Sequence, residues 1–105
     1  MNEREFNALA DAALARIEHA LDRCGADIDC EVRPGGVVEI EFADGSKVIV
    51  NRHGAAREIW VAARSGGFHY GYDGRRWVSA RDGEELMAGL ARCLSEQSGE
   101  TVTLA

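Results

Sequence analysis

The sequence of 105 residues lacks several features that mark particular protein classes. No apolar run approaches the roughly 20 residues that a membrane-spanning helix needs, so we expect no membrane contact. The N-terminal stretch is acidic and lacks the basic-then-apolar layout of a signal peptide, so we expect a cytoplasmic protein. The single proline and the 46% apolar content argue against disorder. We expect one domain over residues 1–105, built around one core.

Cysteine and histidine are too sparse and too scattered to mark a catalytic centre. Cys24, Cys30 and Cys93 form no CxxC pair, and in a reducing cytosol we expect free thiols that pack as small apolar residues. A metal or redox role for Cys24 with Cys30 has no neighbouring His or Cys cluster to support it. The sequence also has no glycine-rich phosphate loop and no serine in a recognisable nucleophile setting. We therefore expect a protein that is not an enzyme.

The chain has little lysine, and its negative charge is unevenly placed. The chain carries a net charge of −6 at pH 7, and residues 1–31 hold eight acidic residues against three arginines. The acidic balance argues against nucleic-acid binding, which needs clustered lysine and arginine. A charge gathered in one segment is typical of a surface that binds a cation or a basic partner.

Hydrophobic periodicity predicts a helix at each end of the chain. Apolar residues recur at three- and four-residue spacing over residues 4–24 and again over about 83–97. Gly25 is a natural stop for the first helix. Asp82 or Ser79 is expected to cap the second helix, with Glu84 and Glu85 in its first turn.

Between the helices, short segments alternate apolar and polar residues as strands do. The predicted strands are 28–33, 37–42, 47–52, 58–63, 68–72 and 76–80, with turns at Asp44-Gly45 and Gly66-Gly67. Short turns predict an antiparallel meander. The fold class is therefore α+β: a two-layer α-β sandwich, with a sheet of five to six strands, both terminal helices on one face and the other face open to solvent. Residues 100–105 are expected to form an extended tail that covers a groove.

The first candidate site is an acidic flank of the first predicted helix. Asp11, Glu18 and Asp22 fall within an arc of roughly 40°, and Asp22, Asp27 and Asp29 cluster where the helix ends. Like charges repel, and anions at a helix C-terminus oppose the macrodipole, so helix stability does not explain this arrangement. A bound hard cation such as Fe³⁺, Ca²⁺ or Mn²⁺ would offset both penalties, through weak binding at several sites. The alternative is a solvated charged face.

The second candidate site is the open face of the sheet. Alternation points Trp60 and His69 outward, and Asn51 emerges nearby. An exposed tryptophan beside polar residues is a plausible anchor for a partner protein. The alternative is that a loop or the C-terminal tail covers Trp60. Trp77 is expected in the core.

Several motifs together resemble those of one known family. They are Asn51-Arg52-His53, Ile59-Trp60-Val61-Ala62 and Gly66-Gly67-Phe68-His69-Tyr70, with the acidic first helix, Asp27-Ile28-Asp29-Cys30-Glu31 and Gly99-Glu100-Thr101-Val102 near the end. In this order they resemble the frataxin family, in its bacterial CyaY-type branch, almost from end to end.

The resemblance implies a regulator of iron–sulfur cluster assembly. It implies iron, Fe²⁺ or Fe³⁺, held weakly on surface carboxylates, and contact with a cysteine desulfurase and its scaffold protein. The implied metal residues are Glu3, Asp11, Glu18, Asp22, Asp27, Asp29 and Glu31. The implied partner residues are Glu18, Asp22, Asn51 and Trp60. We expect a monomer, with iron-dependent oligomers as an open alternative.

Two other functions stay open at this point. One is an iron chaperone or storage protein with ferroxidase activity, and the other is an acidic interaction module without a metal. The chain also departs from the family pattern. Residues 23–26 replace much of a denser acidic run, which predicts a lower iron capacity, and His53 and Glu58 stand where glutamine is common, which could alter the partner surface.

Overall fold

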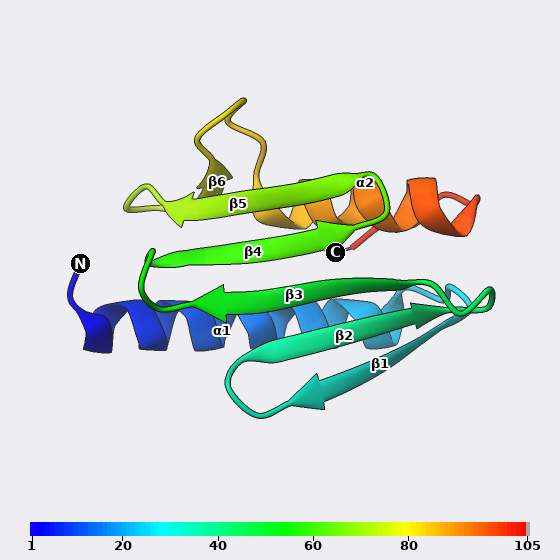
Figure 1. Cartoon of the computed structure of the whole chain (residues 1–105), viewed down its shortest axis with the longest axis horizontal. Helices are drawn as coiled ribbons and strands as arrows, with labels where there is room; N and C mark the ends of the chain where they lie inside the picture. The colour runs from blue at the N-terminus through cyan, green and yellow to red at the C-terminus, as the bar shows by residue number, and fades with distance from the viewer. Residues whose placement is uncertain (105) are drawn as a thin grey trace.

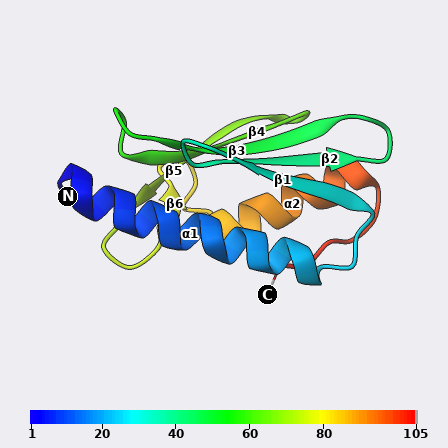
Figure 2. The same ribbon diagram turned by 90° about the horizontal axis from the view of Figure 1, so that it is seen from below.

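The computed structural model describes residues 1–104 and has two layers (Figure 1). The elements follow in the order α1 (Glu3–Arg23), β1 (Ile28–Arg33), β2 (Val37–Phe42), β3 (Lys47–His53), β4 (Glu58–Ala63), β5 (Gly66–Tyr72), β6 (Trp77–Ser79) and α2 (Leu86–Ser98). The six strands form one antiparallel sheet in chain order. Seen along the sheet, both helices lie on the same side of it, which confirms the predicted fold class (Figure 2).

Helix α1 begins and ends close to where the sequence predicts. The side chain of Asn2 caps it by accepting a 2.8 Å hydrogen bond from the backbone N–H of Glu5. Gly25 follows the C-terminus with a φ of 72°, a left-handed conformation that glycine adopts readily. The helix is amphipathic, so its apolar stripe packs on the sheet and its polar side faces solvent.

Helix α2 begins later than predicted, and its predicted cap was wrong. Its N-cap is Glu85, whose carboxylate accepts hydrogen bonds from the backbone N–H groups of Met87 and Ala88. Ser79 and Asp82 belong instead to a separate turn, in which Gly83 donates to the Ser79 carbonyl at 2.8 Å. Gly83 has a φ of 76°, so the helix cannot extend back through it. Glu84 and Glu85, which the sequence placed in the first turn, therefore lie before it.

The predicted turn at Gly66-Gly67 was also wrong. Both glycines belong to β5, where Gly66 pairs with Ala63 and Gly67 pairs with Ala62. The turn is Arg64-Ser65, a two-residue connection of the kind that joins adjacent antiparallel strands.

The core lies between the sheet and the helices. It contains side chains from both helices and from five strands: Phe6, Leu14, Ile17, Val38, Ile40, Val48, Val50, Ile59, Val61, Tyr70, Trp77, Leu86, Leu90 and Leu94 among others. Trp77 is only 6% exposed, which confirms it as the core tryptophan.

The C-terminal tail closes the helix side of this core (Figure 2). Val102 is buried, and its backbone N–H donates to the hydroxyl of Ser95 at 2.9 Å. The tail therefore covers core residues beside α2 as far as residue 104; residue 105 lies outside the described residues. In residues 1–104 no helix combines the length and the apolar character needed to cross a membrane.

Candidate metal and partner surfaces

The acidic residues that follow α1 are divided between the two faces of the sheet. Glu18 and Asp22 lie on the flank of α1 next to β1, where partial burial and these two carboxylates raise the pKa of the Cys30 thiol. Asp29 and Glu31 alternate with Cys30 along β1, so their side chains project from the opposite, open face. The structure therefore brings Glu18 and Asp22 together and separates them from Asp29 and Glu31.

Asp11 already has a cationic partner. Its carboxylate forms an ion pair with the guanidinium of Arg52, whose side chain projects from the end of β3 on the helix side of the sheet. A metal ion at Asp11 would have to compete with this arginine.

Glu3 and Asp27 lie at opposite ends of the α1 layer. Glu3 is in the first turn of α1, about 28 Å along the helix axis from Asp22 at a rise of about 1.5 Å per residue, so the two cannot share an ion. Asp27 is exposed in the loop before β1 and lines a hollow of about 250 Å³ with Asp44 and Glu100.

The open-face acids are partly neutralised. The carboxylate of Glu39 lies 2.7 Å from the Lys47 ammonium and 2.9 Å from the Arg33 guanidinium, and hydrogen bonds from these two groups lower its pKa. Arg33 also lies 3.3 Å from Glu31. Of the predicted metal residues on this face, Asp29 has no ion pair in the described part of the chain, whereas Glu31 has one.

No compact metal cage appears in this arrangement. Within residues 1–104, no three His, Cys, Asp or Glu side chains are grouped so that they could hold one ion. The acidic flank offers single carboxylates and neighbouring pairs, and water would have to complete the coordination of a hard cation there. Such a surface can bind cations only weakly.

The open face carries an ordered aromatic stack centred on Trp60. The His53 ring lies 3.8 Å from the Trp60 ring, centroid to centroid, with 10° between the planes. The His69 ring lies on the other side at 4.3 Å and 7°. The indole Nε1–H of Trp60 donates a 2.8 Å hydrogen bond to Glu58 Oε1, so the tryptophan is held on three sides.

Strand register explains how this stack forms. Asn51, Trp60 and His69 lie in one cross-strand row over β3, β4 and β5, and His53 pairs with Glu58 one row further along. The sequence predicted the outward direction of Trp60 and His69. It missed His53 in the stack, because the predicted strand ended at residue 52 and β3 extends to His53. Extending the alternation from Asn51 by two residues would have found it.

Trp60 is half-buried, and the tail does not cover it. Val102 belongs to the core cluster on the helix side of the sheet, whereas Trp60 is on the open side, so the predicted alternative of a tail over Trp60 was wrong. The two histidines cover both faces of the Trp60 ring, so this surface offers a partner the exposed His69 side chain and the edge of the indole.

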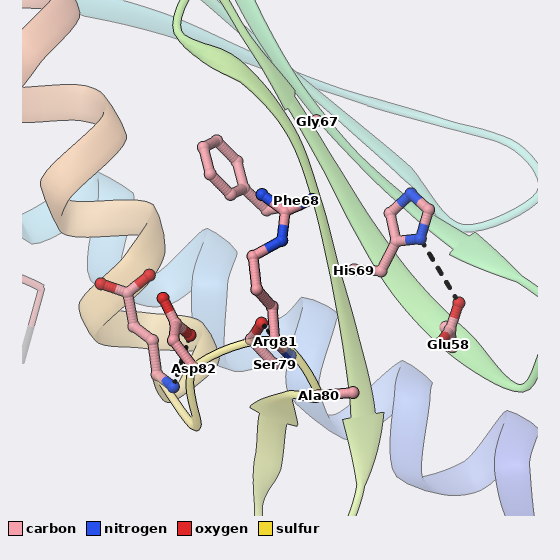
Figure 3. Close-up of a pocket in the computed structure, with 9 residues that line it drawn as sticks. Glu58, Gly67, Phe68, His69, Ser79, Ala80, Arg81 and Asp82 are labelled. Carbon is pink, nitrogen blue, oxygen red and sulfur yellow. Dashed lines mark hydrogen bonds and ion pairs between the residues drawn. The ribbon is translucent and has the colours of Figure 1, made fainter.

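A shallow pocket adjoins this stack at the free half of the β5 edge (Figure 3). It has a volume of about 280 Å³ and lies where β6 ends at Ser79 and the chain turns away from β5. Figure 3 shows His69 and Glu58 on one side of β5 and Phe68 on the other, and the Nδ1 atom of His69 lies 3.8 Å from Glu58 Oε1. The pocket reaches from the stack toward the Arg81–Asp82 turn.

Comparison with known proteins gives a consistent result. A family model described as a frataxin-like domain matches residues 1–100. An iron–sulfur cluster assembly protein CyaY of Dechloromonas aromatica (strain RCB) is 60% identical over 104 residues, which cover 99% of each chain. The structure of a frataxin from Psychromonas ingrahamii superposes with a TM-score of 0.89 at 33% identity, over 100% of this chain and 99% of that one. A trimeric frataxin from the yeast Saccharomyces cerevisiae, complexed with ferrous iron, superposes with a TM-score of 0.66 at 22% identity, over 95% of this chain and 88% of that one.

Proposed function

This chain belongs to the frataxin family, and from that premise we propose that it is an iron-binding, non-enzymatic regulator of iron–sulfur cluster assembly in the cytoplasm. A role in cluster assembly follows from the family and from the name of its CyaY relatives. The proposal adds where iron binds and which surfaces meet the assembly machinery. It rests on one observation: the carboxylates of Glu18 and Asp22 are neighbours on the flank of α1 next to β1, and they form no ion pair in residues 1–104.

The proposed iron surface is centred on these two residues. Asp27 continues it beyond the helix end, while Asp29 and Glu31 form its outer part on the open side of β1. Glu3 and Asp11 are weaker members, because Glu3 is distant and Asp11 is paired with Arg52. Binding by oxygen ligands on an exposed surface suits an ion that must be taken up and released as its concentration varies.

The proposed partner surface combines charge with an aromatic anchor. Glu18 and Asp22 would meet a basic patch on the cysteine desulfurase, an attraction that weakens as salt screens it. Asn51 and Trp60 would contact the desulfurase or its scaffold protein, and the flanking histidines pre-organise the indole ring so that little rotamer freedom is lost on binding. We propose that the protein is a monomer, with iron-dependent oligomers as the alternative.

The ferroxidase alternative has less support. It needs iron ligands grouped around an open position for O₂, and the described part of the chain holds no group of three metal-binding side chains. We therefore do not include it in the proposal.

The test is an anaerobic titration of ¹⁵N-labelled protein with ferrous iron, read from amide shifts and line broadening. We expect changes confined to residues 3–31, strongest around Glu18 and Asp22. The double variant Glu18→Ala/Asp22→Ala should bind iron more weakly and unfold at a higher temperature, because it removes two anions from the C-terminal half of a helix.

A matched control separates site from net charge. Glu5→Ala/Asp82→Asn removes the same two charges from exposed positions that form no ion pair in residues 1–104 and lie outside the Asp27 hollow. This variant should keep its iron affinity within about twofold, because salt screens long-range electrostatic effects. Unchanged iron affinity in the first variant, or signals from His53 and His69 that respond instead, would remove α1 from the iron site.

A further inference from the structure

A groove on the far flank of α1 carries the opposite charge from the acidic flank. It has a volume of about 230 Å³ and is lined by residues of α1, of the turn that joins β5 to β6, and of the start of α2. Figure 2 shows that turn beside α1 on the helix side of the sheet. Its floor is mainly apolar and includes Leu9, Ala13, Trp77 and Met87. Arg16 stands on α1 about 140° around the helix from the mean direction of Asp11, Glu18 and Asp22, so the two flanks are distinct surfaces.

Three arginines line this groove. They are Arg16 from α1 and Arg75 and Arg76 from the β5–β6 turn. Seven of the twelve lysine and arginine side chains of the chain form no ion pair in residues 1–104, and these three are among them. Their guanidinium donors are therefore available to an external anion.

Two acids lie beside these arginines, Asp73 in the same turn and Glu85 in the lining of the groove, and both accept hydrogen bonds from backbone N–H groups. The carboxylate of Asp73 accepts hydrogen bonds of 2.9 Å from the backbone N–H groups of Arg75 and Arg76, which lower its pKa. The carboxylate of Glu85 accepts from the first N–H groups of α2. Neither acid forms a salt bridge with a guanidinium of this groove among the described residues.

We propose that this groove binds a small amphiphilic anion, with its carboxylate on Arg75, Arg76 and Arg16 and its apolar body on the floor formed by Leu9 and Trp77. Guanidinium groups present planar donor pairs that match a carboxylate. The volume is below the roughly 300–1,000 Å³ of sites for drug-sized ligands, so the occupant is a compact molecule such as an arylalkyl carboxylate. The inference is independent of the proposed iron surface.

The test uses 4-phenylbutyrate as the probe and the two indole N–H signals of the ¹⁵N-labelled protein as the readout. Trp77 lies at the groove and Trp60 on the opposite face of the sheet, so the Trp77 signal should shift with saturation while the Trp60 signal stays constant. Neutral 4-phenylbutanol tests the arginines, and acetate tests the apolar floor. Both should bind at least about fivefold more weakly, because the alcohol lacks the carboxylate that the arginines would bind and acetate lacks the apolar body that the floor would contact.

The variant arm compares two double substitutions with the same loss of charge. Arg75→Gln/Arg76→Gln should weaken 4-phenylbutyrate binding about fivefold to tenfold, the loss expected for charge-assisted hydrogen bonds at an exposed rim. Arg4→Gln/Arg81→Gln, whose arginines lie outside the groove, should leave it within about twofold, because exposed charges at a distance are screened. The inference is overturned if no saturable Trp77 shift occurs, if the alcohol or acetate binds as tightly as the probe, or if both double variants lose the same affinity.

Discussion

Replacing Tyr70 by phenylalanine should make the protein more stable. Tyr70 is fully buried, and its hydroxyl is the one buried side-chain polar atom in residues 1–104 without a hydrogen-bond partner. A buried unsatisfied group costs about 1–3 kcal/mol, whereas the lost dispersion contacts of one oxygen amount to a few tenths of a kcal/mol. Tyr70→Phe should therefore raise the free energy of unfolding by about 1–2 kcal/mol.

The gain should grow at alkaline pH. Burial, reinforced by the nearby Glu84 carboxylate, raises the pKa of Tyr70 to about 12, above the usual value of a tyrosine. Above pH 10 the unfolded chain loses the phenol proton while the folded chain keeps it, so the wild-type protein loses stability as the pH rises from about 10 to 12. Phenylalanine has no proton to lose, which adds up to about 2–3 kcal/mol in favour of the variant over those two pH units.

Urea unfolding of both proteins at pH 7 and again above pH 10 measures these two terms. In thermal unfolding at pH 7, the midpoint temperature of the variant should be about 4–8 °C higher for each kcal/mol gained in a domain of this size. Tyr72→Phe is the matched control, because Tyr72 is only partly buried and the same atom is removed. A Tyr70→Phe protein that is less stable than wild type at pH 7 would refute the reasoning, since it would mean that the hydroxyl has a partner.

Two further predictions concern the tight packing at α2 and the open face. Gly89→Ala should destabilise the protein by about 1–3 kcal/mol, because the new Cβ would clash with the hydroxyl of Tyr70. Thermal unfolding measures this loss, and adding Tyr70→Phe should recover part of it. Equal losses with and without Tyr70→Phe would exclude the clash. Trp60→Ala should weaken binding to a cysteine desulfurase or scaffold protein by about thirtyfold or more, as loss of a central anchor costs at least about 2 kcal/mol. Calorimetric titration tests it against Val32→Ala on the exposed β1 edge, and equal affinity of the two variants would remove Trp60 from the interface.

Local patterns in the sequence were enough for most of the fold. Alternation placed all six strands within a few residues and assigned Trp77 to the core and Trp60 to the open face, because burial on a pleated sheet has a period of two. Helical periodicity found both helices for the same kind of reason. The start of α2 was wrong because the choice of cap depends on the turn before it: the left-handed Gly83 and the Ser79 turn leave Glu85 as the cap.

The candidate surfaces needed more than local pattern. Charge counting pointed to the N-terminal third of the chain, and the family resemblance supplied a list of acidic residues. The tertiary structure decided how those residues are shared out: Asp11 pairs with Arg52 from 41 positions away, Glu18 and Asp22 face the Cys30 side of β1, and Asp29 projects from the other face. The sequence by itself determined the elements, the faces and the charge, because these depend on neighbours in the chain. The His53–Trp60–His69 stack, the orphan hydroxyl of Tyr70 and the arginine-lined groove depend on register and on helix placement, which only packing between distant segments decides.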